Sequence, residues 1–205
     1  MAPKRGLCNL NYFSGYIQQS ISVKQNLLKD GVLLNGVQQL SIDCVNAFRN
    51  GNKVILAGNG GSAADAQHIA AEFVSRFMFD RAGLPSISLS TDTSILTAIG
   101  NDYGYEKLFS RQLEANSKPG DIFIGISTSG NSKNIIEAVR ICESLGVICH
   151  VMTGESGGAL SAHTRNVIKV PSKITSLIQE SHIMIGHMLC GYVENEIFGK
   201  QNWRQ

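Results

Sequence analysis

The spacing of apolar residues changes along the chain from a helical period to a strand-like one. Residues 12–49 carry apolar side chains at helical spacing, and Gly31 and Gly36 weaken the middle. We therefore expect two helices that meet near Asp30. After a turn signal at residues 50–52, residues 53–57 form a short apolar run rich in β-branched residues, which is typical of a strand buried on both faces.

Beyond that strand, short apolar runs alternate with helical patterns. Strands are predicted at residues 86–89, 121–126, 147–152 and 167–170. Helices are predicted at residues 63–77, 94–99, 105–115, 135–145 and 176–198. Alternation of this kind predicts an α/β fold, in which a central parallel sheet carries helices on both faces. We expect a single structural domain, with residues 1–50 as an N-terminal helical extension and residues 51–205 as the α/β part.

Composition narrows the classes of partner. The chain has 205 residues and a formal net charge of +2, and its longest basic run is Lys4-Arg5. This balance argues against nucleic acid or an anionic membrane as the main partner. The five cysteines show no C-x-x-C spacing, and the chain contains neither a secretory signal nor an apolar run long enough to span a membrane. We expect a cytoplasmic protein.

Two departures from average composition suggest association and ligand binding. Only 17% of the residues are charged, which suggests that surface is buried against other copies of the chain. The 21 glycines suggest backbone that approaches a ligand closely.

Two loops that follow predicted strands have the composition of phosphate sites. Residues 58–62 read GNGGS and precede a helix, so backbone N–H groups and a helix N-terminus can face an anion. Residues 127–132 read STSGNS and offer four hydroxyls. Neither loop is a P-loop, and the loose dinucleotide match at residues 58–63 lacks its acidic partner. Each loop alone could be a capped helix start, whereas the two together favour a phosphate ester.

Polar side chains interrupt two apolar helices. His68 and Glu72 stand four residues apart, and so share one helix face. The last helix carries Gln179, Glu180, His182 and His187 among apolar residues. Such groups could ligate a divalent metal or perform acid–base catalysis. The alternative is a satisfied buried histidine or an ion pair on the helix surface.

Four motifs together resemble the sugar isomerase (SIS) domain, and in particular the phosphoheptose isomerases. They are LAGNGGSAADAQH at residues 56–68, GNDYG at 100–104, GISTSGNS at 125–132 and IQESH at 178–182. The resemblance covers residues 18–196. It implies a flavodoxin-like three-layer αβα sandwich, with the SIS domain at residues 51–205, a homotetramer and one zinc ion per active site.

The resemblance also implies an activity and its residues. The activity is the isomerisation of D-sedoheptulose 7-phosphate to D-glycero-D-manno-heptose 7-phosphate, the first step towards nucleotide-activated heptoses. The residues it implies for substrate binding are Asn59, Gly60, Gly61, Ser62, Glu72, Arg76, Asn101, Asp102, Ser127, Thr128, Ser129, Ser132 and Gln179. Those implied for zinc are His68, Glu72, Gln179 and His187. The family commonly has Arg where this chain has Leu177.

Aldose–ketose isomerisation moves a proton between C1 and C2 through an enediol, which requires a base and an acid. We expect Glu72 to be the base and His187 the acid, with zinc polarising the oxygens. Gln179 and His187 lie about 12 Å apart along a helix axis, and periodicity alone would pair Glu180 with His187. We therefore expect active sites shared between subunits. The alternatives are a non-catalytic SIS protein that binds a sugar phosphate or a replication initiator, and an isomerase for another ketose.

Overall fold

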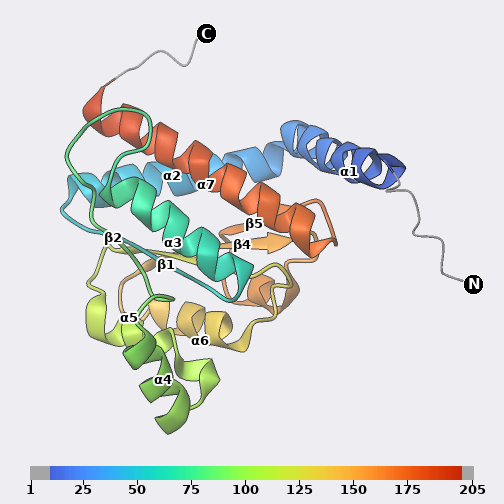
Figure 1. Cartoon of the computed structure of the whole chain (residues 1–205). Helices are drawn as coiled ribbons and strands as arrows, with labels where there is room; N and C mark the ends of the chain where they lie inside the picture. Colours follow the sequence, from blue (N-terminus) through green and yellow to red (C-terminus); the bar gives the residue numbers. More distant parts are fainter. Residues whose placement is uncertain (1–9, 200–205) are drawn as a thin grey trace, which may run out of the picture.

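The computed structural model describes residues 10–199. Two helices open this part of the chain, α1 (Leu10–Lys29) and α2 (Gly31–Arg49). They are separated at Asp30, whose carboxylate accepts a hydrogen bond from the Leu33 N–H at 3.0 Å and so caps α2. The predicted division near Asp30 is confirmed. Helix α1 projects from the body of the molecule, whereas α2 lies along it (Figure 1).

Five parallel strands form one sheet in the order β2-β1-β3-β4-β5. The strands are β1 (Val54–Gly58), β2 (Ser86–Ser88), β3 (Ile122–Ile126), β4 (Ile148–Gly154) and β5 (Val167–Val170). All residues of β1 and β3 are buried, as expected for central strands covered on both faces. The chain leaves β1 towards β2 at one edge and returns to β3 on the other side of β1. This reversal places a topological switch point between β1 and β3.

Helices cover both faces of the sheet and complete the predicted αβα sandwich (Figure 1). One face carries α2, α3 (Gly61–Val74) and α7 (Thr175–Phe198). The other carries α4 (Thr93–Asp102), the 3-10 turn η1 (Tyr105–Lys107), α5 (Ser110–Asn116) and α6 (Lys133–Cys142). Along β1, Val54 and Leu56 pack into the first core while Ile55 and Ala57 pack into the second. The period-2 alternation of a strand thus separates two apolar cores.

The helix predicted at residues 105–115 is broken. Tyr105–Lys107 forms the turn η1, and α5 begins only at Ser110. Between them, Leu108 and Phe109 are both buried in the second core. Neighbouring residues of a continuous helix point about 100° apart, so the break allows both side chains to face the core. A second 3-10 turn, η2 (Gly158–Ala162), was not predicted.

Leu177, where the family commonly has Arg, is 2% exposed and belongs to the first core. In this chain the position therefore contributes apolar packing. Helix α2 packs into the same core, and the division of the chain at residue 50 stays a prediction. Within residues 10–199 no helix combines the length and apolar character needed to cross a membrane.

Candidate active site

The two predicted phosphate loops meet at the switch point of the sheet. Gly58, the last residue of β1, pairs in register with Ile126, the last residue of β3. Residues 59–62 therefore lead into α3, and residues 127–132 lead into α6, at neighbouring positions on the carboxyl edge of the sheet. This edge is where open parallel α/β sheets bind their ligands.

The backbone of both loops depends on glycine. Gly60 has φ +55° and Gly130 has φ +67°, in the region that side chains rarely adopt. A Cβ at Gly130 would also overlap the carbonyl of Gly157, so the second loop packs tightly against the start of η2. Within this loop the hydroxyls of Ser127 and Ser132 are 2.8 Å apart. That these glycines let the backbone approach a ligand stays a prediction.

The N-termini of α3 and α6 have no side-chain cap. Neither Gly60, which precedes α3, nor Ser132, which precedes α6, makes a side-chain hydrogen bond to the helix that follows. In α3 the N–H groups of Ser62 and Ala63 already donate to the carbonyls of Asn59 and Gly60, and in α6 that of Ile135 donates to the carbonyl of Ser132. The N–H groups of Gly61, Lys133 and Asn134 make no hydrogen bond among the described residues and can face an anion. Thr128 and Ser129 also line a cavity of about 340 Å³ that includes Lys173. Two helix N-termini and several hydroxyls at one sheet edge suit a phosphate monoester.

Asn59 connects the two loops. Its amide group donates to Asn134 Oδ1 at 2.9 Å and accepts from Asn134 Nδ2 at 2.8 Å. Tyr105 Oη donates to Asn59 Oδ1 at 2.9 Å. Asn134, in the first turn of α6, is 1% exposed, and the sequence did not single it out. The amide of Asn59 thus joins α6 to the first loop. Substrate binding by Asn59 stays a prediction.

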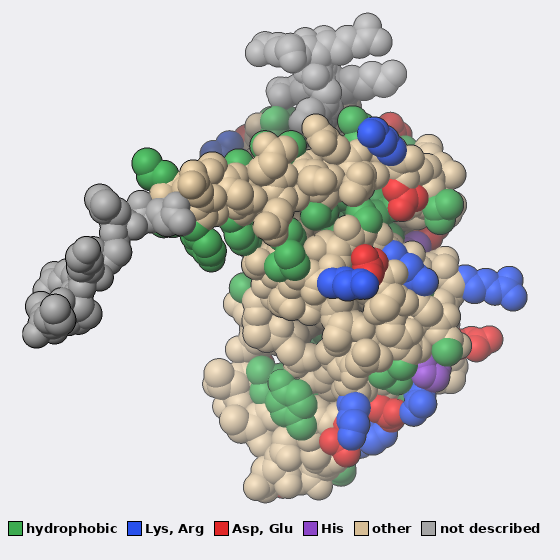
Figure 2. Space-filling model, turned by 90° about the vertical axis from the view of Figure 1, so that its right-hand side faces the viewer, with side chains coloured by type: hydrophobic (Ala, Val, Ile, Leu, Met, Phe, Trp, Pro, Cys, Tyr) green, Lys and Arg blue, Asp and Glu red, His purple; other side chains and the backbone are tan. Residues whose placement is uncertain are grey.

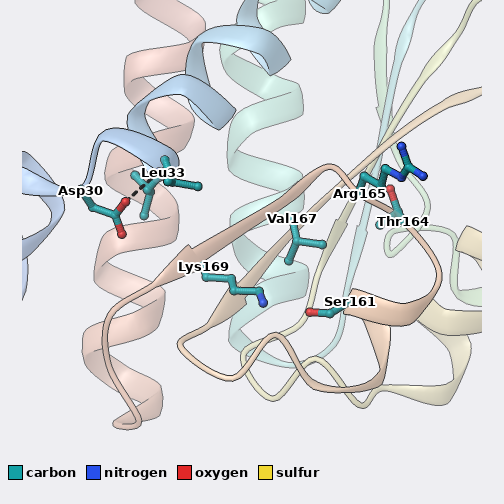
Figure 3. A pocket seen from close by; sticks show the side chains of 8 residues that line it. Asp30, Leu33, Ser161, Thr164, Arg165, Val167 and Lys169 are labelled. Carbon is teal, nitrogen blue, oxygen red and sulfur yellow. Dashed lines mark hydrogen bonds between the residues drawn. The ribbon is translucent and has the colours of Figure 1, made fainter.

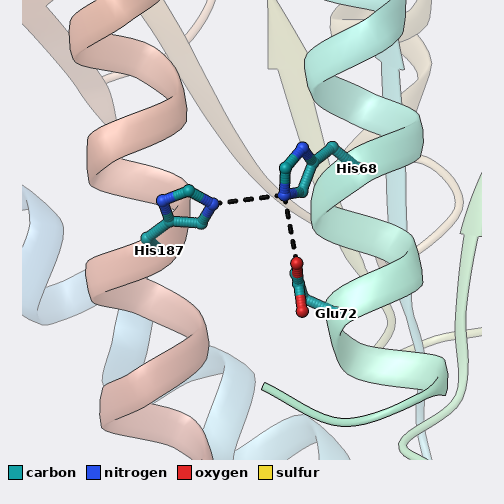
Figure 4. A group of neighbouring side chains, drawn as sticks. All are labelled: His68, Glu72 and His187. Atoms are coloured by element: carbon teal, nitrogen blue, oxygen red, sulfur yellow. Dashed lines mark hydrogen bonds and ion pairs between the residues drawn. The ribbon is translucent and has the colours of Figure 1, made fainter. Parts of the chain in front are cut away.

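Three potential ligands converge between α3 and α7 (Figure 4). His68 Nε2 lies 3.0 Å from Glu72 Oε1 and 3.2 Å from His187 Nε2. One atom from each residue lies within 4.8 Å of the others. The i,i+4 spacing on α3 brings His68 and Glu72 together, and the packing of α7 beside α3 adds His187.

The donor set of this cluster fits a divalent metal. A single hydrogen on His68 Nε2 cannot point at both of its partners, whereas a cation would satisfy all three atoms. Ligand atoms arranged tetrahedrally around zinc at about 2.1 Å lie about 3.4 Å from one another. The separations of 3.0 and 3.2 Å in the cluster are close to that value. Two histidines and one glutamate supply three ligands, which leaves room for a fourth.

Gln179 lies elsewhere in the same chain. A Cβ at Gly61 would overlap the Gln179 amide, and one at Gly186 would overlap Ile69. Helices α3 and α7 therefore run in the same direction, with Gln179 beside the start of α3 and His187 beside its third turn. Gln179 and His187 of one chain stay about 12 Å apart along α7.

Helical periodicity alone would pair Glu180 with His187, and the structure does not show this pairing. Its carboxylate accepts hydrogen bonds from Tyr16 at 2.8 Å, Ser20 at 2.6 Å and Lys24 at 3.1 Å, all on α1. These bonds, that of Ser20 above all, lower the pKa of Glu180. Glu180 thus fastens α1 to α7 and does not pair with His187.

Three further predicted site residues are not part of the cluster. Asn101 and Asp102 end α4, on the opposite face of the sheet from α3 and α7 (Figure 1), where Asn101 donates to Asp102 at 2.7 Å. Arg76 is exposed, just beyond the end of α3. Their contact with a substrate stays a prediction.

Several polar groups near the cluster were missed by the sequence reasoning. Asp65 lies one turn before His68, and burial raises the pKa of its carboxyl to about 6 against the opposing effect of His68. One oxygen of Asp65 is buried without a hydrogen-bond partner among the described residues. Glu194 and Arg81 form a buried ion pair at 2.9 Å. The pair joins residues that are 113 positions apart, and no local pattern could have revealed it.

Another cavity, of about 430 Å³, lies between the start of α2 and the segment from η2 to β5 (Figure 3). Its lining includes Asp30, Arg165 and Lys169. None of its lining residues belongs to the loops or to the cluster. It is therefore separate from the candidate active site.

Comparisons with known proteins agree with this geometry. Residues 15–154 match the family of the SIS domain. A phosphoheptose isomerase of Aneurinibacillus thermoaerophilus is 60% identical over 92% of this chain and 95% of its own length. Phosphoheptose isomerase 2 of Campylobacter jejuni is 58% identical over 94% of this chain and 96% of its own.

A solved phosphoheptose isomerase from Francisella tularensis superposes with a TM-score of 0.86 at 34% identity, over 92% of this chain and all of its own. One from Neisseria gonorrhoeae superposes with a TM-score of 0.82 at 39% identity, over 91% and 98%. Fold, sequence and site therefore agree, and the chain belongs to the phosphoheptose isomerases of the SIS domain family.

Proposed function

We propose that this chain isomerises D-sedoheptulose 7-phosphate to D-glycero-D-manno-heptose 7-phosphate. The observation that carries the proposal is the convergence of His68, Glu72 and His187 beside α3, the helix that begins at the first phosphate loop. His68 and Glu72 lie about 9 and 15 Å along α3 from Ser62, at 1.5 Å per residue. An extended heptose 7-phosphate likewise carries its phosphate at the opposite end from its reacting carbons, C1 and C2.

Phosphate binding would involve both loops. Ser62, Ser127, Thr128, Ser129 and Ser132 supply hydroxyls, and the starts of α3 and α6 supply N–H groups. The Asn59–Asn134 hydrogen bonds hold the loops at a fixed separation. This arrangement anchors the sugar by its phosphate and directs the other end along α3.

We further propose zinc as the metal, held by His68, Glu72 and His187, with Gln179 contributed by a neighbouring subunit. The donor chemistry and the 3.0–3.2 Å separations support this choice. When bound, zinc would supply positive charge beside the substrate oxygen on which negative charge develops.

Proton transfer falls to Glu72 and His187. Glu72 Oε1 faces His68, whereas Oε2 has no hydrogen-bond partner among residues 10–199 and is available to take a proton from carbon. His187 contacts His68 through Nε2, and its Nδ1 is likewise without a partner in the described part of the chain. We assign the base to Glu72 and the exchange of the hydroxyl proton to His187.

A homotetramer with shared active sites is part of the proposal. Hydrophobic side chains are exposed along α1, which extends from the body (Figure 2): Leu10, Tyr12, Phe13, Ile17, Ile21 and Leu28. Apolar surface of this kind marks an interaction site. A neighbouring subunit could also bring its Gln179 to the cluster, which Gln179 of the same chain does not reach. The free thiols of Cys44, Cys142, Cys149 and Cys190 support a cytoplasmic location.

Incubation of the purified protein with sedoheptulose 7-phosphate, with and without a chelator, tests the proposal. NMR should show an aldose phosphate that forms with the metal present and disappears with the chelator. A non-catalytic sugar-phosphate-binding protein would broaden the substrate signals without forming product. Conversion of a shorter ketose phosphate in preference to the heptulose would instead identify an isomerase of another specificity.

A further inference from the structure

A buried carboxylate on α7 organises the segment that follows α3. Glu194 is 1% exposed, and it accepts hydrogen bonds from the backbone N–H groups of Phe77 at 2.9 Å and Met78 at 2.7 Å. It also accepts from Arg81 Nε at 2.9 Å. Glu194 lies seven residues after His187, and two helical turns place both side chains on the same face of α7, towards α3.

Arg81, the partner of Glu194 in the buried ion pair, contacts the end of α3. Its guanidinium donates to the carbonyl of Glu72 at 2.8 Å and to that of Phe73 at 2.6 Å. It donates to the carbonyl of Ser75 at 3.1 Å as well. These are orphan carbonyls at the C-terminal end of α3, where a cation is favourable. One buried ion pair therefore connects the backbone of Glu72 to α7.

The segment that Glu194 holds places the aromatic ring of Phe77 beside the cluster. Phe77 stacks on His187 with ring centroids 5.5 Å apart and planes 27° apart. His68 also contacts the His187 ring, with centroids 5.1 Å apart and planes 58° apart. The His187 imidazole thus lies against two rings, of which only the His68 ring belongs to the metal cluster.

The contacts of the Glu194–Arg81 pair lead towards the metal cluster. A buried ion pair is in general weak evidence for fold stability, although removal of one partner is costly. The hydrogen bonds of this pair go to the backbone of Glu72 and Phe77. Phe77 in turn packs on the flat face of His187, where a ring restricts rotation of the imidazole.

We propose that Phe77 is a positioning residue for His187, and that the Glu194–Arg81 pair holds Phe77 in place. The inference rests on the proposed function only in taking His187 as a metal ligand. Loss of the hydrogen-bonding partners that orient a ligating histidine typically costs about 10- to 100-fold in metal affinity or activity, which sets the scale for an orienting ring. Phe77 packs on the face of the His187 ring and so does not occupy either ring nitrogen.

The test is the Co²⁺ affinity of Phe77→Leu, measured on the full chain by visible absorbance in competition with a chelator. We expect the affinity to fall by about 10-fold or more, with a matching loss in kcat/KM. Phe77→Tyr retains the ring and should bind Co²⁺ as tightly as the unmodified protein.

Phe48→Leu is the matched control. Phe48 is also half-buried, and its ring meets Phe73 of α3 at 5.3 Å, away from the histidines. Phe48→Leu should lower the thermal midpoint about as much as Phe77→Leu does, while leaving Co²⁺ affinity unchanged.

Unchanged Co²⁺ affinity in folded Phe77→Leu overturns the inference, as does an equal loss in Phe48→Leu. Glu194→Gln supplies a second measurement, because it removes the charge and keeps one acceptor oxygen. It should weaken Co²⁺ binding in the same direction as Phe77→Leu. If the unmodified protein binds Co²⁺ but does not convert the heptulose phosphate, the proposed function fails while the affinity comparison still decides the role of Phe77.

Discussion

Asn59 and Asn134 exchange two amide hydrogen bonds, 2.9 and 2.8 Å long, across the switch point of the sheet. They connect the loop before α3 to the first turn of α6 over 75 positions of sequence. Asn134→Ala removes both bonds and frees the two loops to separate. We expect KM for the phosphorylated substrate to rise about tenfold, and the free energy of unfolding to fall by about 1–3 kcal/mol, because a partly buried amide loses its partner.

Asn116→Ala is the control for this change. Asn116 ends α5 and donates one hydrogen bond to the Gln112 carbonyl at 2.9 Å, far from either loop. Its removal should leave KM unchanged. An Asn134→Ala protein with unaltered KM would show that the loops bind phosphate without this link.

The proposed sharing of active sites within a homotetramer makes a specific prediction for mixed assemblies. Gln179→Ala and His187→Ala should each be inactive alone. In a tetramer reassembled from both, about one quarter of the sites would combine an intact Gln179 of one copy with an intact His187 of another. Activity should reappear on mixing after reversible dissociation. A site complete within one chain predicts no recovery, because every chain would lack one of the two residues.

Because Glu180 attaches α1 to α7, its removal should weaken the proposed association of subunits through α1. Glu180→Ala removes the acceptor of three α1 side chains: Tyr16, Ser20 and Lys24. Because these bonds lower the pKa of Glu180, they favour the folded arrangement above pH 4.5 and are lost as the pH falls below it. Sedimentation velocity should show Glu180→Ala dissociating at a several-fold higher protein concentration than the parent.

Glu196→Ala provides the matched control for Glu180→Ala. Glu196 stands on the same helix and makes an exposed ion pair with Arg49 at 4.0 Å. Its loss should leave the sedimentation profile unchanged. If both variants sediment as the parent does, α1 is not held in the assembly by Glu180.

His182 predicts a loss of stability in acid. It is fully buried, and burial lowers its pKa from 6.5 to about 4, although a hydrogen bond to the Thr153 carbonyl opposes the shift. The unfolded chain therefore binds a proton at a higher pH than the folded chain does. Stability is complete above pH 6.5 and declines as the pH falls towards 4, by about 3 kcal/mol in total at 1.36 kcal/mol per pH unit.

Denaturant titrations at pH 4.5 and 7.5 measure this decline. His182→Gln cannot take up the proton and retains a donor for the Thr153 carbonyl. It should show a smaller difference between the two pH values than the parent chain. His150, whose pKa burial also lowers, remains in both proteins and accounts for part of the residual difference. Equal differences in both proteins would contradict the assignment.

The sequence revealed those parts of the site that local spacing determines. Glycine and hydroxyl composition identified both loops, and the i,i+4 spacing placed His68 beside Glu72. The order of apolar runs predicted the parallel sheet, because buried strands and amphipathic helices have different periods.

Periodicity failed for α7 for a physical reason. This helix is apolar around most of its circumference, and its buried residues face the sheet, α2 and α3. A pattern without one polar face cannot tell which polar residue faces which neighbour. It therefore could not assign Glu180 to α1 or His187 to α3. The Asn59–Asn134 and Arg81–Glu194 contacts were missed because they join distant segments through single side chains.

We propose that Glu72 moves the proton during isomerisation of a heptose 7-phosphate. The most direct test is turnover of sedoheptulose 7-phosphate by Glu72→Gln and by the unmodified protein, followed by NMR at equal zinc content. We expect the unmodified protein to form the aldose phosphate and Glu72→Gln to lose about 10²- to 10⁴-fold in kcat. Near-normal turnover by folded, zinc-loaded Glu72→Gln, or no conversion by the unmodified protein, would contradict the claim.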